Sequence, residues 1–204
     1  MTEPAKAGRG IEAAEVDAGA EAAAGAVPVW LVAEGQPLEA VEGLSAAQRA
    51  WLGAQKFTGA AKKQVLLADA EGRLAGVVLG TGKGATGEPC GPAELITGQL
   101  AASLPAGTYK LAGGAGHGEL AALSWGLGAY RFGRYKSAES SGGQVRLVVP
   151  EGVTAARLVN MVEAVWLGRD LINTPASDMG PEEIDAAARE LAADELKIDE
   201  GEHD

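Results

Sequence analysis

Short apolar runs alternate along this chain with longer segments whose apolar side chains recur at helical spacing. The runs that fit β-strands are residues 27–32, 64–68, 74–79, 108–112 and 144–149. The helical patterns are residues 93–104, 119–132, 154–172 and the stretches that begin at Ser45 and Pro181. Several strand-like runs are apolar throughout, as strands covered on both faces are. The alternation therefore predicts an α/β fold whose sheet is covered by helices.

Two short patterns predict local structure within this alternation. Ser45 and Gln48 have the spacing of a capping box, in which each side chain satisfies a backbone N–H group of the other residue. Asp69 and Gly72 occupy the first and fourth positions that a type I turn favours. The strands on either side of that turn are therefore expected to form a hairpin.

Composition divides the chain into three parts. Residues 1–26 are rich in Ala, Gly and Glu and hold few large apolar side chains, so they are interpreted as a disordered tail. Residues 27–152 carry the alternating pattern and are predicted to form the α/β domain. Residues 153–204 contain two further helical patterns and form the third part.

The last of these parts has several local signals. Thr154 is a suitable cap for the long helix, and Pro175 ends it because the residue before a proline avoids the helical region. Residues 196–198 fit the start of another strand. Without a sheet to cover them, Ile184 and Leu191 are expected to stay partly exposed, with a frayed or loosely docked C-terminus.

The net charge of −11 is concentrated at the two ends. Residues 1–26 hold five acidic and two basic side chains, and residues 182–204 hold ten acidic and two basic ones. The stretch between them is balanced, with no basic stripe that could contact phosphates. Direct binding of nucleic acid by this chain is therefore not expected.

The single cysteine, Cys90, excludes an internal disulfide and fits a reducing compartment. No apolar run approaches the roughly 20 residues that a membrane-spanning helix needs. The N-terminus lacks the apolar core of a signal peptide and is too acidic for a transit peptide. These features predict a cytoplasmic protein that does not enter a membrane.

Two stretches carry a resemblance to a known family. Residues 169–181 read Arg-Asp-Leu-Ile-Asn-Thr-Pro-Ala-Ser-Asp-Met-Gly-Pro. Leu-Pro-Ala-Gly-Thr-Tyr at 104–109 is followed by Ala-Ala-Leu-Ser-Trp-Gly-Leu-Gly-Ala-Tyr-Arg-Phe at 121–132 and Arg-Tyr-Lys at 134–136. The first stretch closely resembles the opening of the catalytic domain of leucyl (cytosol) aminopeptidases, and the second is similar to the N-terminal domain of bacterial members. The resemblance spans residues 27–200, which is less than half of a full family member.

This resemblance implies a macro-domain-like N-terminal sheet, a linker helix and a truncated start of a catalytic domain. Family members are hexamers that release amino acids from peptide N-termini, using two divalent cations (zinc or manganese) to activate a water. Their metal ligands lie in later motifs, Gly-Lys-Gly with Phe-Asp-x-Gly-Gly and then Asn-Thr-Asp-Ala-Glu-Gly-Arg. It therefore implies no catalytic, cofactor-binding or metal-binding residue in this chain, which is expected to be non-catalytic and to support the hexamer. Asp170, Asn173 and Asp178 are interpreted as structural.

Two short matches imitate those later motifs. Residues 69–73 read Asp-Ala-Glu-Gly-Arg, and Lys83 lies within Gly-Lys-Gly, so Asp69, Glu71 and Lys83 are candidate metal ligands. The order of the two matches is reversed, and both precede residues 169–181, whereas the family's metal motifs follow that segment. The neighbouring residues of both motifs are also missing. The interpretation of residues 69–72 as a hairpin turn is therefore preferred.

Glycine-rich loops support a second class of function. Residues 80–85 follow a strand but lack the Ser or Thr of a phosphate-binding loop after Lys83. Residues 113–118 lie between a strand and a helix, where backbone N–H groups can hold an anion. A flexible connection is the simpler interpretation. Since the family's N-terminal domain resembles macro domains, binding of ADP-ribose is the alternative function, and assembly with full-length subunits is a third.

The remaining metal-binding side chains are few. Only His117, His203 and Cys90 could supply imidazole or thiolate ligands, and a metal site needs several that converge. Glu119 is expected in the first turn of a helix, where negative charge is favoured.

Overall fold

A computed structural model describes residues 25–83, 93–112, 118–135 and 144–199, with side chains up to residue 192. The chain divides into two compact units, Met1–Val162 and Glu163–Asp204, each of which is described by itself. Most of the predicted N-terminal tail, residues 1–24, lies outside the described residues. Ala26 is buried, so packed structure begins slightly before the expected start at Val27.

The described residues of the first unit form a five-stranded sheet. Its strands are β1 (Val27–Ala33), β2 (Gln64–Ala68), β3 (Leu74–Gly82), β4 (Gly107–Ala112) and β5 (Val145–Leu147). Their order across the sheet is β2-β3-β1-β4-β5. Strand β2 is antiparallel to β3, and the remaining pairs are parallel. An antiparallel hairpin therefore closes one edge of a parallel sheet.

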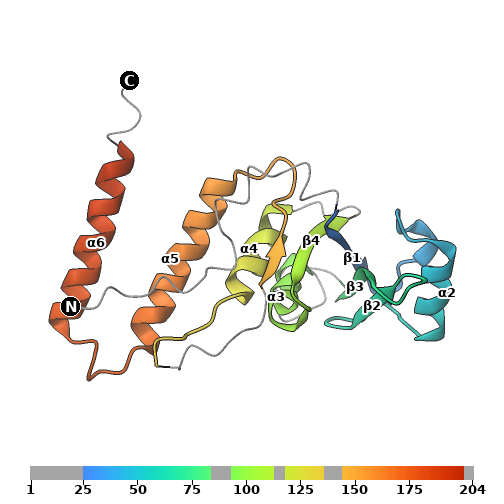
Figure 1. Cartoon of the computed structure of the whole chain (residues 1–204), viewed down its shortest axis with the longest axis horizontal. Helices are drawn as coiled ribbons and strands as arrows, with labels where there is room; N and C mark the ends of the chain where they lie inside the picture. The colour runs from blue at the N-terminus through green and yellow to red at the C-terminus, as the bar shows by residue number, and fades with distance from the viewer. Residues whose placement is uncertain (1–24, 84–92, 113–117, 136–143, 200–204) are drawn as a thin grey trace. The chain divides into compact units, whose positions relative to one another are not determined.

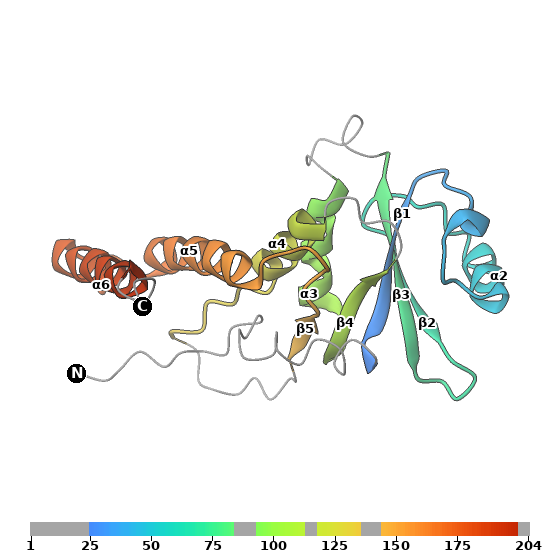
Figure 2. The same ribbon diagram turned by 90° about the horizontal axis from the view of Figure 1, so that it is seen from above.

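Helices cover both faces of this sheet (Figure 1). Figure 2 shows α2 on one side of the strands and α3 and α4 on the other. The elements of these layers are η2 (Leu38–Ala40), α2 (Ala46–Ala54), η3 (Ala93–Gln99), α3 (Leu100–Ser103) and α4 (Gly118–Gly128). This arrangement confirms the predicted α/β fold.

Strand β1 shows why its sequence is apolar throughout. Trp30 and Val32 pack with Leu52 of α2, whereas Val29 packs with Leu100 and Trp125 on the opposite face. Successive side chains of a strand point to opposite faces. Because both faces are covered by helices, alternate residues all lie in a hydrophobic core.

The predicted capping box is confirmed at the start of α2. The Gln48 N–H donates to the Ser45 hydroxyl at 3.2 Å, and the Ser45 N–H donates to the Gln48 side chain at 2.8 Å. The predicted hairpin is also confirmed, since Gly72 donates to the Asp69 carbonyl and has a φ of 79°. Only glycine adopts that left-handed conformation without steric penalty.

Several element boundaries differ from the expectation, among them that of β3, which runs to Gly82 and takes in the first three residues of the expected loop at 80–85. The helix expected over residues 93–104 is a 3-10 helix followed by the short α3, and the helix expected over 119–132 ends at Gly128. The strand expected over 144–149 comprises Val145–Leu147. For the helix expected over residues 93–104, a tertiary contact determines the backbone conformation: the Thr97 hydroxyl donates to the carbonyl of Ala121 at 2.7 Å. A buried hydrogen bond of this kind contributes more free energy than the difference in helix propensity between residues.

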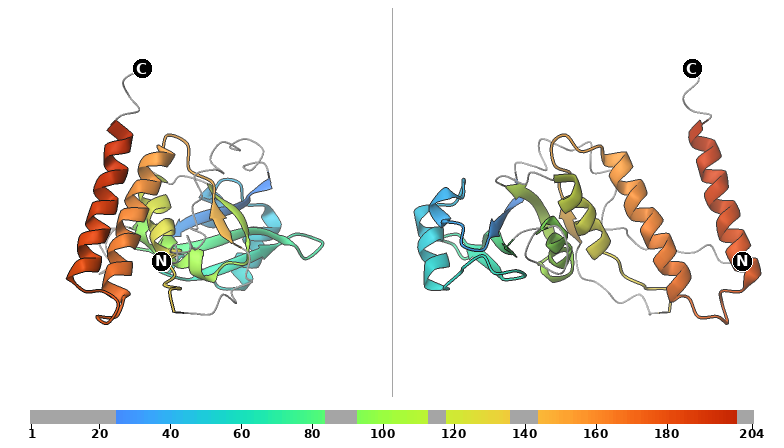
Figure 3. Two further views of the ribbon diagram at one scale, coloured as in Figure 1. Left: turned by 60° about the vertical axis from the view of Figure 1, so that its left-hand side comes forward. Right: turned by 180° about the vertical axis from the view of Figure 1, so that it is seen from behind.

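The long helix α5 (Ala155–Asn173) crosses the boundary between the two units, and α6 (Pro181–Asp199) lies within the second (Figure 3). The expected strand start at residues 196–198 is wrong, because these residues belong to α6. Ala, Glu and Leu dominate the preceding turns and favour a continuing helix. Ile184 and Leu191 are about half exposed, as expected.

Candidate functional site

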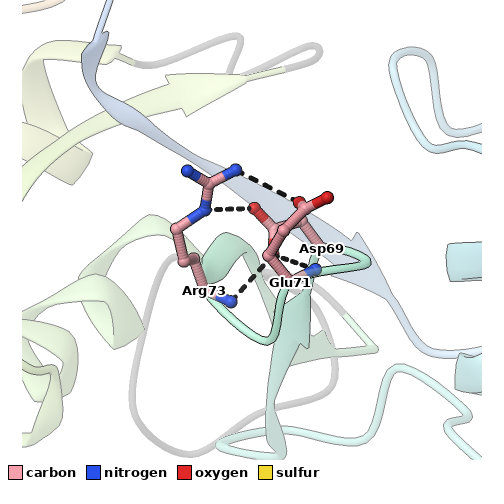
Figure 4. A network of polar contacts seen from close by, with 3 residues as sticks. All are labelled: Asp69, Glu71 and Arg73. Carbon is pink, nitrogen blue, oxygen red and sulfur yellow. Dashed lines mark hydrogen bonds and ion pairs between the residues drawn. The ribbon is translucent and has the colours of Figure 1, made fainter.

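The acidic motif at residues 69–73 forms a closed network at the tip of the β2–β3 hairpin (Figure 4). One carboxylate oxygen of Asp69 accepts the backbone N–H groups of Glu71 at 3.0 Å and of Arg73 at 2.8 Å. Its other oxygen accepts the Arg73 Nε–H at 2.9 Å. The Glu71 carboxylate accepts from the same guanidinium at 3.1 Å. The two acidic side chains thus hold the turn and its arginine.

These contacts set the charge state of Asp69. Hydrogen bonds from the Arg73 backbone, together with the nearby guanidinium, lower the pKa of the Asp69 carboxyl below its ordinary value. Donors that point at a carboxylate stabilise its ionised form. The side chains of Arg73 and Glu71 are 75% and 65% exposed, so solvent screens the ion pairs. The network is a turn motif on the surface.

Lys83, the third candidate ligand, lies far from this turn. The hairpin tip precedes β3, whereas Lys83 directly follows the last residue of that strand. A strand rises about 3.3 Å per residue, so the nine residues of Leu74–Gly82 separate the two ends by about 30 Å. The topology therefore does not bring Asp69, Glu71 and Lys83 into one site.

The described residues do not fit a divalent cation. Within the described parts of the chain, no three His, Cys, Asp or Glu side chains are grouped so that they could hold a metal ion. The Asp69 carboxylate is already engaged by three donors, which leaves it poorly placed as a ligand.

The carboxyl ends of the parallel strands form a second candidate site. The chain leaves β1 for α2 on one face, and it leaves β4 for α4 on the other face. Sheets of this kind bind ligands at the carboxyl ends of the strands where the connections diverge in this way. The relevant point in this sheet is the boundary between β1 and β4.

The segment at residues 58–63 packs against the carboxyl ends of β1 and β3, on the side of β1 away from β4. Gly35 donates to the Thr58 carbonyl at 3.1 Å, and Gly82 donates to the Gly59 carbonyl at 2.9 Å. Gly59 has a φ of 80°, and a Cβ there would lie 2.2 Å from the Ala33 carbonyl oxygen. The carboxyl ends of β1 and β3 are thus packed against backbone, with no room for even a methyl group. Sequence reasoning missed this function of Gly59, whose only signal is a glycine beside small residues.

Several sequence candidates lie outside the described residues. Among them are residues 113–117 of the glycine-rich loop, including His117, together with residues 84–85, Cys90 and His203. Glu119 lies in the first turn of α4, as expected, and forms an ion pair with Arg157 at 3.5 Å.

The segment at residues 169–181 joins α5 to α6. The hydroxyl and the backbone N–H of Thr174 both donate to the Asp170 carbonyl, at 2.7 and 3.0 Å, where α5 ends. The Gly180 N–H donates to the Glu183 carboxylate at 2.8 Å, where α6 begins. These contacts end one helix and start the next.

Comparison with known proteins decides the family. The model of the M17 aminopeptidase N-terminal domain matches residues 27–150, which is more than half of the chain. The chain belongs to the M17 aminopeptidase family. The match covers the whole five-stranded sheet and its covering helices.

Curated relatives agree with this assignment. Two proteins named probable cytosol aminopeptidase, from Rhodococcus opacus and Rhodococcus jostii, are 39% and 37% identical over 93 residues. These alignments cover 39% of this chain and 18% of each relative. The M17 chain therefore spans only a small part of the length of these proteins.

Solved structures share the fold. The cytosol aminopeptidase from Coxiella burnetii has a TM-score of 0.69 at 27% identity, over 83% of this chain and 36% of that one. The bottromycin maturation enzyme BotP, solved in complex with Mn, has a TM-score of 0.60 at 24% identity, over 82% of this chain and 36% of that one. A tomato leucine aminopeptidase mutant has a TM-score of 0.57 at 18% identity, over 82% of this chain and 39% of that one.

In the described residues, no helix is long and apolar enough to cross a membrane.

Proposed function

We propose that this M17 domain acts as the N-terminal part of a cytoplasmic aminopeptidase that releases amino acids from peptide N-termini. Two divalent cations, zinc or manganese, would activate the attacking water in that enzyme and polarise the scissile carbonyl. The described residues hold no group of ligands for such a site, and the role proposed for this chain is non-catalytic. This role is to support a homohexamer and to restrict access to its active sites.

The observation that carries this proposal is the family match over residues 27–150. The hairpin turn supports the non-catalytic role, because one of the two motifs that imitate metal-binding sequences, residues 69–73, is held in that turn by its own hydrogen bonds. The segment at residues 169–181 supports the proposed order of a linker helix followed by the first helix of the catalytic domain, because it ends α5 and starts α6. Residues 153–204 correspond to the linker helix and the first helix of the catalytic domain.

A domain exchange tests the proposal. Residues 27–150 would replace the corresponding domain of the Coxiella burnetii cytosol aminopeptidase, and hydrolysis of leucine p-nitroanilide would be measured with added Mn²⁺. The chimera is expected to retain activity within about tenfold of the parent, equivalent to less than about 1.4 kcal/mol in barrier height. The parent without any N-terminal domain is the control. A folded chimera with no more activity than this control would contradict the proposed role.

Binding of ADP-ribose is the second candidate function. The divergence of connections at the β1–β4 boundary favours it, because that is where sheets of this class bind nucleotides. Residues 58–63 pack against the ends of β1 and β3, which leaves less room on the β3 side of that boundary. A thermal-shift titration with ADP-ribose separates the two functions. A saturable rise in Tm would favour a nucleotide-binding module, and an unchanged Tm would leave the role as an aminopeptidase domain as the remaining function.

A further inference from the structure

Strand β2 is an edge strand that lacks two of the usual forms of protection, charged side chains and proline, although its register with β3 shifts between Leu67 and Ala68. It is the last strand in the sheet order, so it has a neighbour on one side only among the described residues. Natural edge strands avoid unwanted pairing through charged side chains, prolines or bulges that turn the edge away. Residues 64–68 read Gln-Val-Leu-Leu-Ala and hold no charge and no proline. The hairpin that carries β2 extends at its tip beyond the neighbouring strands (Figure 3, left).

The hydrogen-bond pattern shows which residues face outward. Gly80 donates to the Lys63 carbonyl, and Asp69 donates to the Arg73 carbonyl, so Lys63 and Asp69 both bond toward β3. Bonded and non-bonded pairs alternate along an antiparallel ladder. Between these two positions the outward-facing residues are therefore Gln64, Leu66 and Ala68. Their backbone N–H and C=O groups form a row that another strand can pair with.

The side chains of this row favour an apolar partner strand. Leu66 is 44% exposed, which is unusual for a leucine in a strand, and Ala68 is also exposed. The Gln64 side chain accepts a hydrogen bond from the Ser103 hydroxyl of α3 at 3.0 Å, which holds it on the α3 face. A strand added at this edge would cover Leu66 without disturbing the core.

The residues that flank β2 carry opposite charges. Lys62 and Lys63 precede the strand, and Asp69 and Glu71 follow it. If two copies of β2 run antiparallel with Leu66 of each at the centre, Lys63 of one copy lies directly opposite Asp69 of the other. Opposite charges in directly facing positions stabilise a strand pair. The pattern is therefore complementary to itself under two-fold symmetry.

We propose that two copies of this chain associate through their β2 edges, joining their sheets into one continuous antiparallel pair about a two-fold axis at Leu66. Each outward residue contributes one N–H and one C=O, so the two strands form about six backbone hydrogen bonds between the copies. The two Leu66 side chains cover each other. An isologous contact of this kind closes on itself, so it makes a dimer and not a filament. The inference does not depend on the proposed enzymatic role.

The second copy is a better fit than an unrelated strand because one register satisfies the backbone, the leucine and the flanking charges together. A shift of the register by two residues would move each Leu66 away from its counterpart. In one direction it places Lys63 opposite Leu67, and in the other it places Lys63 opposite Glu71, which lies in the turn beyond the end of β2. Parallel pairing would place like charges side by side at both ends, which is destabilising.

Site-specific disulfide formation in the full chain tests the register. All variants would carry Cys90→Ser, and each would be oxidised mildly at several protein concentrations. Directly opposed residues of a bonded antiparallel pair have Cα atoms about 5.5 Å apart, within disulfide range. Leu66→Cys is therefore expected to form a covalent dimer at least about tenfold faster than Gln64→Cys or Ala68→Cys alone. In those single variants the two identical positions lie four residues apart along the strands, about 13 Å, which is out of range.

Two further outcomes follow from the register. A mixture of the Gln64→Cys and Ala68→Cys chains is expected to form the mixed dimer, because those positions face each other. In sedimentation equilibrium, Leu66→Lys is expected to weaken the dimer at least about tenfold by placing two lysines face to face, whereas the matched surface change Trp51→Lys on α2 leaves it unchanged. Equal rates for all three single cysteine variants would overturn the proposed register. A parent chain that stays monomeric at the highest soluble concentration would overturn the self-pairing and leave the edge for a strand of another protein.

Discussion

Gly128 and Gly53 both lie in helices, and replacing each by alanine should change the free energy of unfolding in opposite directions. A Cβ at Gly128 would lie 1.9 Å from the carbonyl oxygen of Gly98 and 2.7 Å from its Cα. Carbon and oxygen normally approach no closer than about 3.3 Å, so α4 and η3 would have to separate locally by about 1.4 Å. Such overpacking costs about 1–3 kcal/mol. At Gly53 nothing lies within 4 Å of the added methyl group.

Gly128→Ala is therefore expected to destabilise the chain by about 2 kcal/mol, because backbone and not a flexible side chain opposes the new methyl group. Gly53→Ala is expected to stabilise it by about 0.5–1 kcal/mol through the lower flexibility of the unfolded chain. Urea unfolding followed by circular dichroism measures both changes. In thermal melts they correspond to a fall of about 4–8 °C and a rise of about 2–3 °C. If Gly128→Ala were neutral or stabilising, the close packing of α4 on η3 would be refuted.

Three further predictions concern the core, a helix cap and the hairpin turn. Leu52→Ala removes a fully buried side chain and is expected to cost about 2–5 kcal/mol in urea unfolding, whereas Trp51→Ala, on the exposed side of α2, stays within about 0.5 kcal/mol. Ser45→Ala removes the N-cap hydroxyl and is expected to cost about 1 kcal/mol, with the loss seen in the same assay. Asp69 has a lowered pKa, so its stabilising effect is present above its ordinary pKa of about 4 and is lost as the pH falls through the folded value. Tm measured from pH 6 to pH 2 should therefore fall less steeply for Asp69→Asn than for the parent, and parallel curves would refute this origin of the pH dependence.

The sequence predicts the parts of this fold that depend on local patterns. The capping box at Ser45 and the turn at Asp69 form because their hydrogen bonds join residues close together in the chain. The α/β class also follows from local periodicity, since β1 is apolar throughout and both of its faces are covered. The family resemblance depends on short stretches of identical residues and needs no knowledge of packing.

Features that depend on distant contacts are not visible in the sequence. The 3-10 form of η3 depends on Thr97, whose hydroxyl bonds across 24 residues to Ala121. The closure over the ends of β1 and β3 depends on Gly59 and Gly80, whose missing side chains matter only once the strands are aligned. The exposed edge of β2 likewise emerges only from the strand order.

The difference between local and distant contacts also explains why the candidate metal ligands do not form a site. Asp69, Glu71 and Lys83 are close in sequence and imitate two motifs of the family. The strand between the hairpin tip and Lys83 carries them to opposite ends of the sheet. Motif spacing alone does not reveal this separation. Whether two motifs lie close together depends on whether the chain between them turns back or, as in β3, continues in one direction.

Hydrolysis of leucine p-nitroanilide by the purified chain, with added Mn²⁺ or Zn²⁺, tests the central claim most directly. The account predicts no turnover above that of the metal alone, and no difference between the parent and a Glu71→Gln/Lys83→Met variant. Metal-dependent turnover that survives repurification and disappears in that variant would contradict it, because the hairpin turn would then belong to an active site.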